Sequence, residues 1–265
     1  MPGEERETEG GGVVKELSLF SGAGGGLLAS KHLLGWETVG YVEIEEYCQK
    51  VLAQRIKDGL LDEAPIFTDI RAFNNSGCAA LYYGITDIIS GGFPCTDISC
   101  AKTGAEGIDG KQSGLWKEML STICTVRPRY VFVENTAALL GRGFSTVLKD
   151  LSESGYNAKW DVFPAAAFGI RHIRERLFVF ATTEPVDNTD CINARNIKRY
   201  TPAYWRWLQN DSIGSCFNGL PWSDEPELDR VAYGVANSVD RNKAIGNGQV
   251  PICAAIAFKI LSGLA

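Results

Sequence analysis

Residues 16–26 of the chain read Glu16-Leu17-Ser18-Leu19-Phe20-Ser21-Gly22-Ala23-Gly24-Gly25-Gly26. We interpret residues 16–20 as a strand, residues 21–26 as a glycine-rich turn and residues 27–34 as a helix. This order lets a ligand approach the backbone N–H groups at a helix N-terminus. A nicotinamide-binding GxGxxG fingerprint counted from Gly22 would need a glycine at position 27, where Leu27 stands. The turn therefore disfavours a nicotinamide oxidoreductase, and a plain tight turn is the alternative interpretation.

Three later segments also place binding or reactive residues at the ends of expected strands. Residues 38–42 precede Glu43, residues 65–70 include Asp69, and residues 87–90 precede Gly91-Gly92-Phe93-Pro94-Cys95. An acid about 20 positions after the first glycine is placed to accept hydrogen bonds from a ribose, although Glu43 also suits a helix N-cap region. Functional residues that recur at strand carboxyl ends predict an α/β fold with a doubly wound, mostly parallel sheet.

Cys95 is the strongest candidate for a reactive side chain. It follows two glycines and a proline just beyond an expected strand, so we expect it to be exposed and locally rigid. A lone cysteine is more often a small buried apolar residue. Here the strand 130–133 ends in Glu134-Asn135, and Arg174-Glu175-Arg176 precedes the strand 177–181. A nucleophile, an acid and two cations on three separate elements indicate a catalytic site.

Two polar segments suggest further contacts with a substrate. Residues 96–114 carry four scattered glycines and are too long for an ordinary connector, which favours a lid. Residues 193–210 interleave cations with aromatic side chains, a mixture that suits phosphates and bases. A small satellite core with a solvated basic rim explains the second segment equally well.

The composition sets limits on the class of protein. The 265 residues permit one large domain, alone or with a small appendage, and the net charge of −6 counts mildly against a nucleic-acid substrate. Eight cysteines without a CxxC pair, and no secretory signal, predict a reduced cytoplasmic protein. With two histidines far apart we expect no metal site, and no apolar run is long enough to cross a membrane.

Five segments, in this order, resemble the motifs of the cytosine-C5 DNA methyltransferases, which have a Rossmann-like fold. The resemblance rests on the S-adenosylmethionine loop at 19–25, the nucleophile motif at 92–95, the Glu-Asn-Val motif at 134–136, the Gln-x-Arg-x-Arg segment at 172–176 and the Gly-Asn-Ser motif at 246–248. This chain departs from the motifs at Thr96, Thr136, His172 and Gly248, and none of these changes removes a catalytic group.

The resemblance implies a reaction and a role for each catalytic residue. Cys95 would add to C6 of a flipped cytosine, protonated Glu134 would donate to N3, and Arg174 and Arg176 would stabilise charge near O2. The methyl group would come from S-adenosylmethionine. Phe20 would pack on the adenine, Glu43 would bind the ribose, and the remaining cofactor-binding residues would be Gly22, Ala23, Gly24, Gly25, Gly26, Ile44, Asp69, Ile70, Gly92, Pro94, Leu115, Asn247 and Gly248.

The implied partner is double-stranded DNA, with no membrane and no metal. Phosphates would be bound by Lys102, Lys111, Arg195, Lys198, Arg199 and Arg206. Two alternatives keep the fold: an RNA cytosine-C5 methyltransferase, although the Cys-Phe-Thr of that branch is absent, and a catalytically silent DNA-binding relative. The sequence does not determine whether a partner restriction nuclease exists.

Composition and the resemblance together divide the chain into four parts. Residues 1–12 would form a disordered tail, residues 13–182 a catalytic and cofactor-binding domain, and residues 183–243 a small, irregular target-recognition region. Residues 244–265 would return to the catalytic domain as a C-terminal helix.

Overall fold

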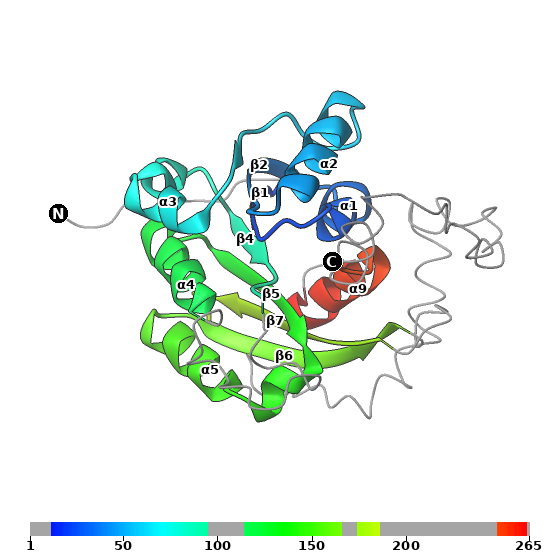
Figure 1. Ribbon diagram of the computed structural model, residues 1–265. Coiled ribbons are helices and arrows are strands. Elements are labelled where there is room, and N and C mark those ends of the chain that lie inside the picture. Colours follow the sequence, from blue (N-terminus) through cyan, green and yellow to red (C-terminus); the bar gives the residue numbers. More distant parts are fainter. Residues whose placement is uncertain (1–11, 95–113, 166–173, 186–247, 264–265) are drawn as a thin grey trace, which may run out of the picture.

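The computed structural model describes residues 12–94, 114–165, 174–185 and 248–263. Within these residues one sheet has the strand order β3-β2-β1-β4-β5-β7-β6 (Figure 1). Pairing is parallel from β3 to β5, and β7 is antiparallel to both β5 and β6. The predicted doubly wound, mostly parallel sheet is confirmed. The strands are β1 (Lys15–Leu19), β2 (Glu37–Val42), β3 (Ile66–Phe67), β4 (Ile88–Gly91), β5 (Tyr130–Thr136), β6 (Asn157–Pro164) and β7 (Glu175–Thr182).

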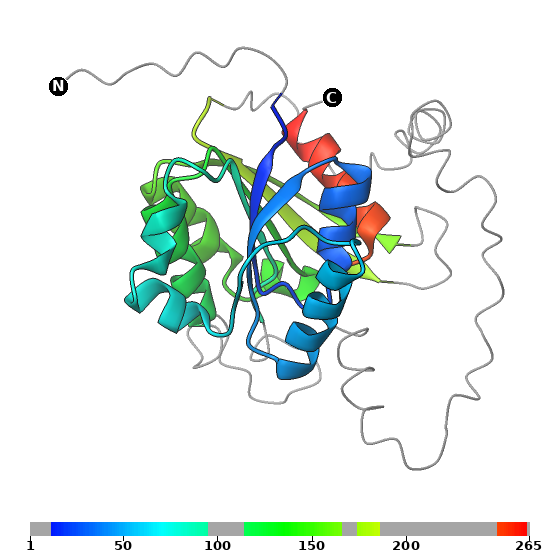
Figure 2. The ribbon, with the colours of Figure 1, turned by 90° about the horizontal axis from the view of Figure 1, so that it is seen from above.

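Helices cover both faces of this sheet (Figure 2). The first face carries α3 (Ile70–Asn75), α4 (Leu115–Val126) and α5 (Phe144–Glu153), together with the short 3₁₀ helices η1 (Cys78–Tyr82) and η3 (Ala137–Gly141). The second face carries α1 (Gly25–Leu33), α2 (Glu46–Lys57) and α9 (Pro251–Ser262). Helices α1 and α9 pack against each other, so the last described element lies beside the first helix.

Alternation along the strands explains the two layers, because successive side chains point to opposite faces. Leu17 and Leu19 of β1 and Val131 of β5 face the core under α3, α4 and α5. Tyr130 and Phe132 of β5 face the other way and belong to the core around α9.

Two expected elements differ from the structure. The strand expected over residues 65–70 has only two residues, because Asp69 Oδ1 accepts a hydrogen bond from Arg71 N at 2.9 Å and starts α3 instead. The strand expected to end at residue 133 continues to Thr136, because the antiparallel pairing with β7 reaches Arg176. Glu134 and Asn135 therefore lie inside a strand and are held by its ladder.

The order of the strands fixes where a ligand is expected. β1 pairs with β2 on one side and with β4 on the other. The strands after β1 are added first toward β3 and then, from β4 onward, toward the opposite edge, so the strand order reverses between β1 and β4. Ligands of open α/β sheets bind outside the carboxyl ends of the strands at such a point. In the part of the chain that the structure describes, no helix is long and apolar enough to cross a membrane.

Candidate active site

A pocket opens at the carboxyl ends of β1 and β4. The turn after β1 lines it through Phe20, Ser21, Gly22 and Ala23. Phe20 has φ of +53° and Gly22 has φ of +56°, so the chain takes two left-handed residues directly after the strand. A left-handed phenylalanine is strained, and such strain concentrates at functional sites. The backbone strain makes the glycine-rich turn a candidate ligand-binding element.

Glu43 ties this turn to the end of β2. Its Oε2 accepts a hydrogen bond from Gly22 N at 2.6 Å, and its Oε1 accepts one from Glu45 N at 2.8 Å. The side chain is buried, and burial raises the pKa of Glu43 above its ordinary value although both hydrogen bonds oppose the shift. The carboxylate thus holds the loop in place. Each oxygen keeps a second lone pair with which to accept a ligand hydroxyl.

The C-terminal segment closes the pocket from the opposite side through Gln249. A Cβ atom added at Gly25 would lie 2.5 Å from Gln249 O, and one added at Gly26 would lie 2.7 Å from Gln249 Oε1. The first contact is with backbone, so Gly25 requires glycine, whereas at Gly26 the Gln249 side chain would have to move. Gln249 Nε2 also lies 3.7 Å from the position of a Cβ at Gly92. One glutamine thereby contacts the glycine-rich turn and the loop that leads to Cys95.

Glu134 is the principal titratable group that lines the pocket. It is buried, and Arg176 Nε lies 2.7 Å from its Oε1. A Cβ at Gly92 would lie 2.8 Å from Glu134 Oε2, so that oxygen faces the loop after β4. Burial raises the pKa of Glu134 from 4.5 to about 7, although Arg176 and Arg174 both lower it. The carboxyl group therefore exchanges a proton near neutral pH.

Two buried contacts hold the loop after β4. Asn135 Nδ2 donates to Phe93 O at 3.1 Å, and the Phe93 ring packs on Trp116 with centroids 5.3 Å apart. In the C-terminal segment, Gly248 O accepts a hydrogen bond from Arg174 Nη2. Burial lowers the pKa of Arg174, with the charge of Arg176 as the next cause. Neighbouring positions on β5 thus provide an acid and an anchor for the residues that precede Cys95.

Comparison with known proteins identifies the family. A family model described as "C-5 cytosine-specific DNA methylase" matches residues 14–242. The chain belongs to this family. The type II methyltransferase M.CviJI of Paramecium bursaria Chlorella virus IL3A is 31% identical over 188 residues, which cover 70% of this chain and 48% of that protein. The type II methyltransferase M.Sau3AI of Staphylococcus aureus is 31% identical over 188 residues, which cover 63% of this chain and 43% of that protein.

The chain spans less than half the length of these two relatives. Solved structures show the same fold at low sequence identity. The S. pombe Dnmt2 methyltransferase matches with a TM-score of 0.54 and 17% identity over 72% of this chain and 55% of that one. A Spodoptera frugiperda DNMT2 mutant matches with a TM-score of 0.52 and 19% identity over 68% and 54% of the two chains.

The structure of this family member brings many of the predicted site residues together. The pocket is lined by Phe20, Gly22, Ala23, Gly25, Gly26, Gly92, Glu134 and Gly248, and Arg174 and Arg176 adjoin it through the contacts given above. Other predicted residues do not line it, Glu43 among them, which contacts the pocket only through Gly22. Asp69 caps α3, Ile70 is buried in the core, Ile44 is 59% exposed, Leu115 starts α4, and Gly24 and Pro94 flank the two loops.

Several predicted residues lie outside the described residues. They are Cys95, Asn247, Lys102, Lys111, Arg195, Lys198, Arg199 and Arg206. The expected tail, lid and target-recognition segments fall largely in the same parts of the chain.

The sequence did not predict Gln249 as a site residue, and it assigned Asn135 to a motif without a role. Gln249 follows the Gly-Asn motif directly, but only the fold brings it to the glycine-rich turn more than 200 positions away. Asn135 was noticed as part of a motif, and the structure supplies its contact with Phe93. The position of Gln249 next to a motif was the one available signal.

Proposed function

We propose that the chain transfers a methyl group from S-adenosylmethionine to C5 of cytosine in double-stranded DNA, through a covalent Cys95 adduct at C6. The observation that supports this best is the environment of Glu134. A carboxyl group with a pKa of about 7, fixed at Oε1 by Arg176, is suited to protonate a cytosine ring nitrogen at neutral pH. The names of the type II relatives favour DNA as the substrate.

The residues of the pocket fit S-adenosylmethionine. Gly25 allows the backbone of Gln249 to approach and Gly26 its side chain, and the left-handed turn after Phe20 leaves no side chain at Gly22. We assign the ribose hydroxyls to the spare lone pairs of Glu43 and the adenine to the edge near Ile44 and Asp69. The exposed Ile44 side chain offers an aliphatic surface there. Bound S-adenosylmethionine would supply an electrophilic methyl group on a sulfonium.

Cys95 would act as the nucleophile of the reaction. Its thiolate would form a bond to C6 of cytosine, and the electron pair displaced from the C5–C6 double bond would make C5 nucleophilic. Asn135 positions the backbone at Phe93, two residues before Cys95. After methyl transfer, loss of the C5 proton to a base and elimination of the thiol would restore the aromatic ring and the free enzyme.

Glu134 would supply a proton from a particular oxygen. Arg176 Nε lies against Oε1, which favours placing the proton on Oε2. Oε2 faces Gly92 and therefore the loop that presents Cys95. Donation to N3 offsets the negative charge that develops on the ring as sulfur adds to C6. Arg176 then stabilises the carboxylate that is left behind.

We further propose that the target base leaves the helix and that residues 96–114 close behind it, with Lys102 and Lys111 on phosphates. Residues 183–243 would recognise the target within the four-part organisation predicted above. Replacing Lys198 and Arg199 together by alanine should lower the slope of log affinity against log salt by up to about 2. An unaltered slope would place these cations in a solvated rim.

Expression in a methylation-free host, followed by base-resolution sequencing of its DNA, tests the proposed activity. We expect methylated cytosines in a defined sequence context, and none with Cys95→Ala. Absence of methylation in DNA, together with methylated cytosines in host RNA, would overturn the choice of substrate. Absence of both would overturn the activity.

DNA that contains 5-fluorocytosine tests the nucleophile. Fluorine replaces the proton that is lost in the last step, so the adduct should survive denaturation. We expect the complex with the wild type and with Cys100→Ala, and its loss in Cys95→Ala. The opposite result for the two variants would move the nucleophile to Cys100.

A further inference from the structure

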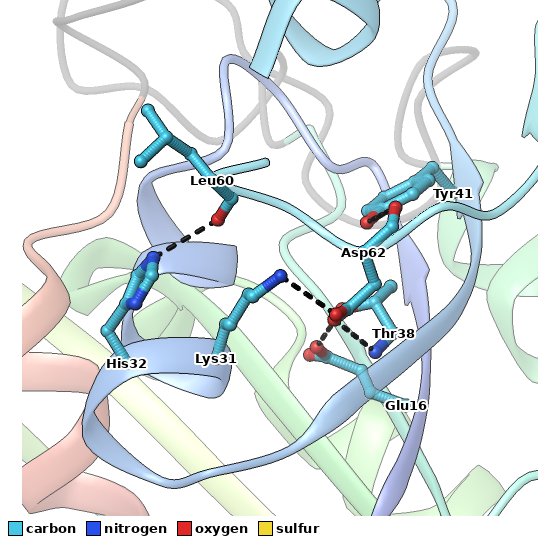
Figure 3. Close-up of polar contacts among 7 residues, drawn as sticks. All are labelled: Glu16, Lys31, His32, Thr38, Tyr41, Leu60 and Asp62. Carbon is cyan, nitrogen blue, oxygen red and sulfur yellow. Dashed lines mark hydrogen bonds and ion pairs between the residues drawn. The ribbon is translucent and has the colours of Figure 1, made fainter. Parts of the chain in front are cut away.

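A buried carboxyl group lies beneath the candidate active site and takes no part in the chemistry proposed above. Glu16 of β1 is 1% exposed. Its Oε1 accepts hydrogen bonds from Ser30 Oγ at 2.9 Å and from Ser90 Oγ, and its Oε2 accepts one from Thr38 Oγ1 at 3.1 Å. Figure 3 shows Glu16 and Thr38 beside the Lys31–Asp62 pair. Hydroxyl groups on three elements thus converge on one carboxyl.

The charged side chains near Glu16, Lys31 and Asp62, pair with each other and not with Glu16. Lys31 Nζ lies 2.9 Å from Asp62 Oδ1, and Asp62 Oδ2 accepts a hydrogen bond from Thr38 N at 2.9 Å. Burial raises the pKa of Glu16, and the charge of Asp62 raises it further, while the three hydroxyl groups lower it. Glu16 is therefore held by neutral hydrogen bonds in a place where an apolar side chain would be cheaper to bury.

The three hydroxyl groups stand on the elements that carry the candidate site. Ser30 lies on α1, which starts within the glycine-rich turn, and its Oγ also lies 3.3 Å from Gly26 O. Ser90 lies on β4, directly before Gly91 and Gly92. Thr38 lies on β2, which ends beside Glu43. Ser30 and Ser90 line the pocket, and Thr38 does not.

We infer that Glu16 is a positioning residue that fixes α1, β2 and β4 relative to one another, so that the glycine-rich turn and Gly91-Gly92 meet in a preformed cofactor pocket beside Glu43. A binding site performs only when its supporting hydrogen bonds hold it within about 0.5 Å of the productive geometry. The inference rests on the proposed function, because it assigns the pocket to S-adenosylmethionine.

Three substitutions separate positioning from plain stability. Glu16→Leu removes every hydrogen bond, Thr38→Val removes one without touching the pocket, and Glu16→Gln keeps both acceptor and donor capacity. Tyr156→Phe is the matched control, because Tyr156 Oη donates a buried hydrogen bond to Pro128 O at 2.7 Å beneath the other face of the sheet. Calorimetry with S-adenosylmethionine, steady-state kinetics and thermal unfolding are measured for all four.

We expect Glu16→Leu to raise the Kd for S-adenosylmethionine about tenfold and Thr38→Val about threefold, because the first removes three hydrogen bonds and the second removes one. Glu16→Gln should stay within about twofold of the wild type. Tyr156→Phe should lower the melting temperature and leave the Kd unchanged. If Glu16→Leu is too unstable to purify, Thr38→Val and Glu16→Gln still decide the matter.

An unchanged Kd and kcat in Thr38→Val, and in Glu16→Leu where that variant folds, with only the melting temperature lowered, would overturn the inference. An equal loss of affinity in Glu16→Gln and Glu16→Leu would also contradict it, because charge would then matter and not hydrogen bonding. A wild-type protein that binds no S-adenosylmethionine would instead refute the proposed function, so the two failures are distinguishable.

Discussion

The two faces of the sheet use the same strands for different purposes. On the first face, Leu17 and Leu19 of β1 and Val133 of β5 lie in an apolar core under α3, α4 and α5. On the second face, alternate residues of the same strands place Glu16, Ser18, Ser90 and Glu134 under or beside α1. The first face stabilises the fold through this core. The second face combines the apolar core around α9 with a polar patch, whose buried carboxyl groups Glu16 and Glu134 lie in a low-dielectric environment that raises their pKa values.

Burial of a carboxyl group costs free energy, and it also keeps a proton on that group at neutral pH. Burial of Glu134 without full compensation destabilises its ionised form, which is the reason that its pKa reaches about 7. A carboxyl group on the solvated surface would be ionised at that pH and would have no proton to donate. The comparison therefore predicts large effects on activity from changes in the polar patch of the second face, and large effects on stability from changes in the apolar core of the first face.

The largest effect is expected at Glu134 itself. Glu134→Gln removes the transferable proton while keeping the shape, so kcat should fall about a thousandfold, within the range for general acid catalysis. Cofactor affinity should be retained. Glu153→Gln, on the exposed surface of α5, is the matched control and should have no effect. Equal activity of the Glu134 variant and the wild type in single-turnover assays would remove Glu134 from the mechanism.

A substitution in the apolar core should lower stability and leave cofactor affinity unchanged. Leu151 of α5 is fully buried, and Leu151→Ala should lower the free energy of unfolding by about 3 kcal/mol because it leaves a cavity. Urea titration measures this loss. Calorimetry at a temperature where the variant is folded should show an unchanged Kd for S-adenosylmethionine. A tenfold change in that Kd would show that the two faces are not independent.

Stability should depend on pH through Glu134. Its folded pKa of about 7 lies above the ordinary 4.5, so the folded state binds more protons between these values. The contribution is fully present below about pH 4.5 and is lost as the pH rises through 7. Between pH 5 and 8 the wild type should lose about 2 kcal/mol relative to Glu134→Gln. Parallel stability curves for the two proteins would contradict the shifted pKa.

The smallest effect is expected where the C-terminal segment meets the glycine-rich turn. Gly25→Ala places a Cβ 2.5 Å from Gln249 O, and overpacking of this kind costs about 1–3 kcal/mol. Cofactor affinity should therefore fall about tenfold. Gly141→Ala, where a Cβ meets nothing within 4 Å, is the control. Wild-type affinity in Gly25→Ala would mean that the segment is not part of the pocket.

Local patterns were sufficient to predict most of the fold. The apolar run at 130–133 and the glycines after Phe20 specify a strand and a turn wherever they occur, because both depend on neighbours in sequence. Asp69 was misjudged because one side-chain hydrogen bond turned an expected strand into a helix N-terminus. The contacts of Gln249 and Glu16 depend on residues far away in the chain, and patterns of neighbouring residues do not predict these contacts.

Titration of the Glu134 carboxyl carbon by NMR, with glutamate labelled with ¹³C at the side-chain carboxyl, tests the central claim most directly. The signal is assigned as the one that Glu134→Gln removes. Burial beside Gly92, opposed by Arg176 and Arg174, should place its midpoint near pH 7. A midpoint at or below the ordinary value of 4.5 would show that Glu134 is ionised at neutral pH, and would contradict its role as the proton donor.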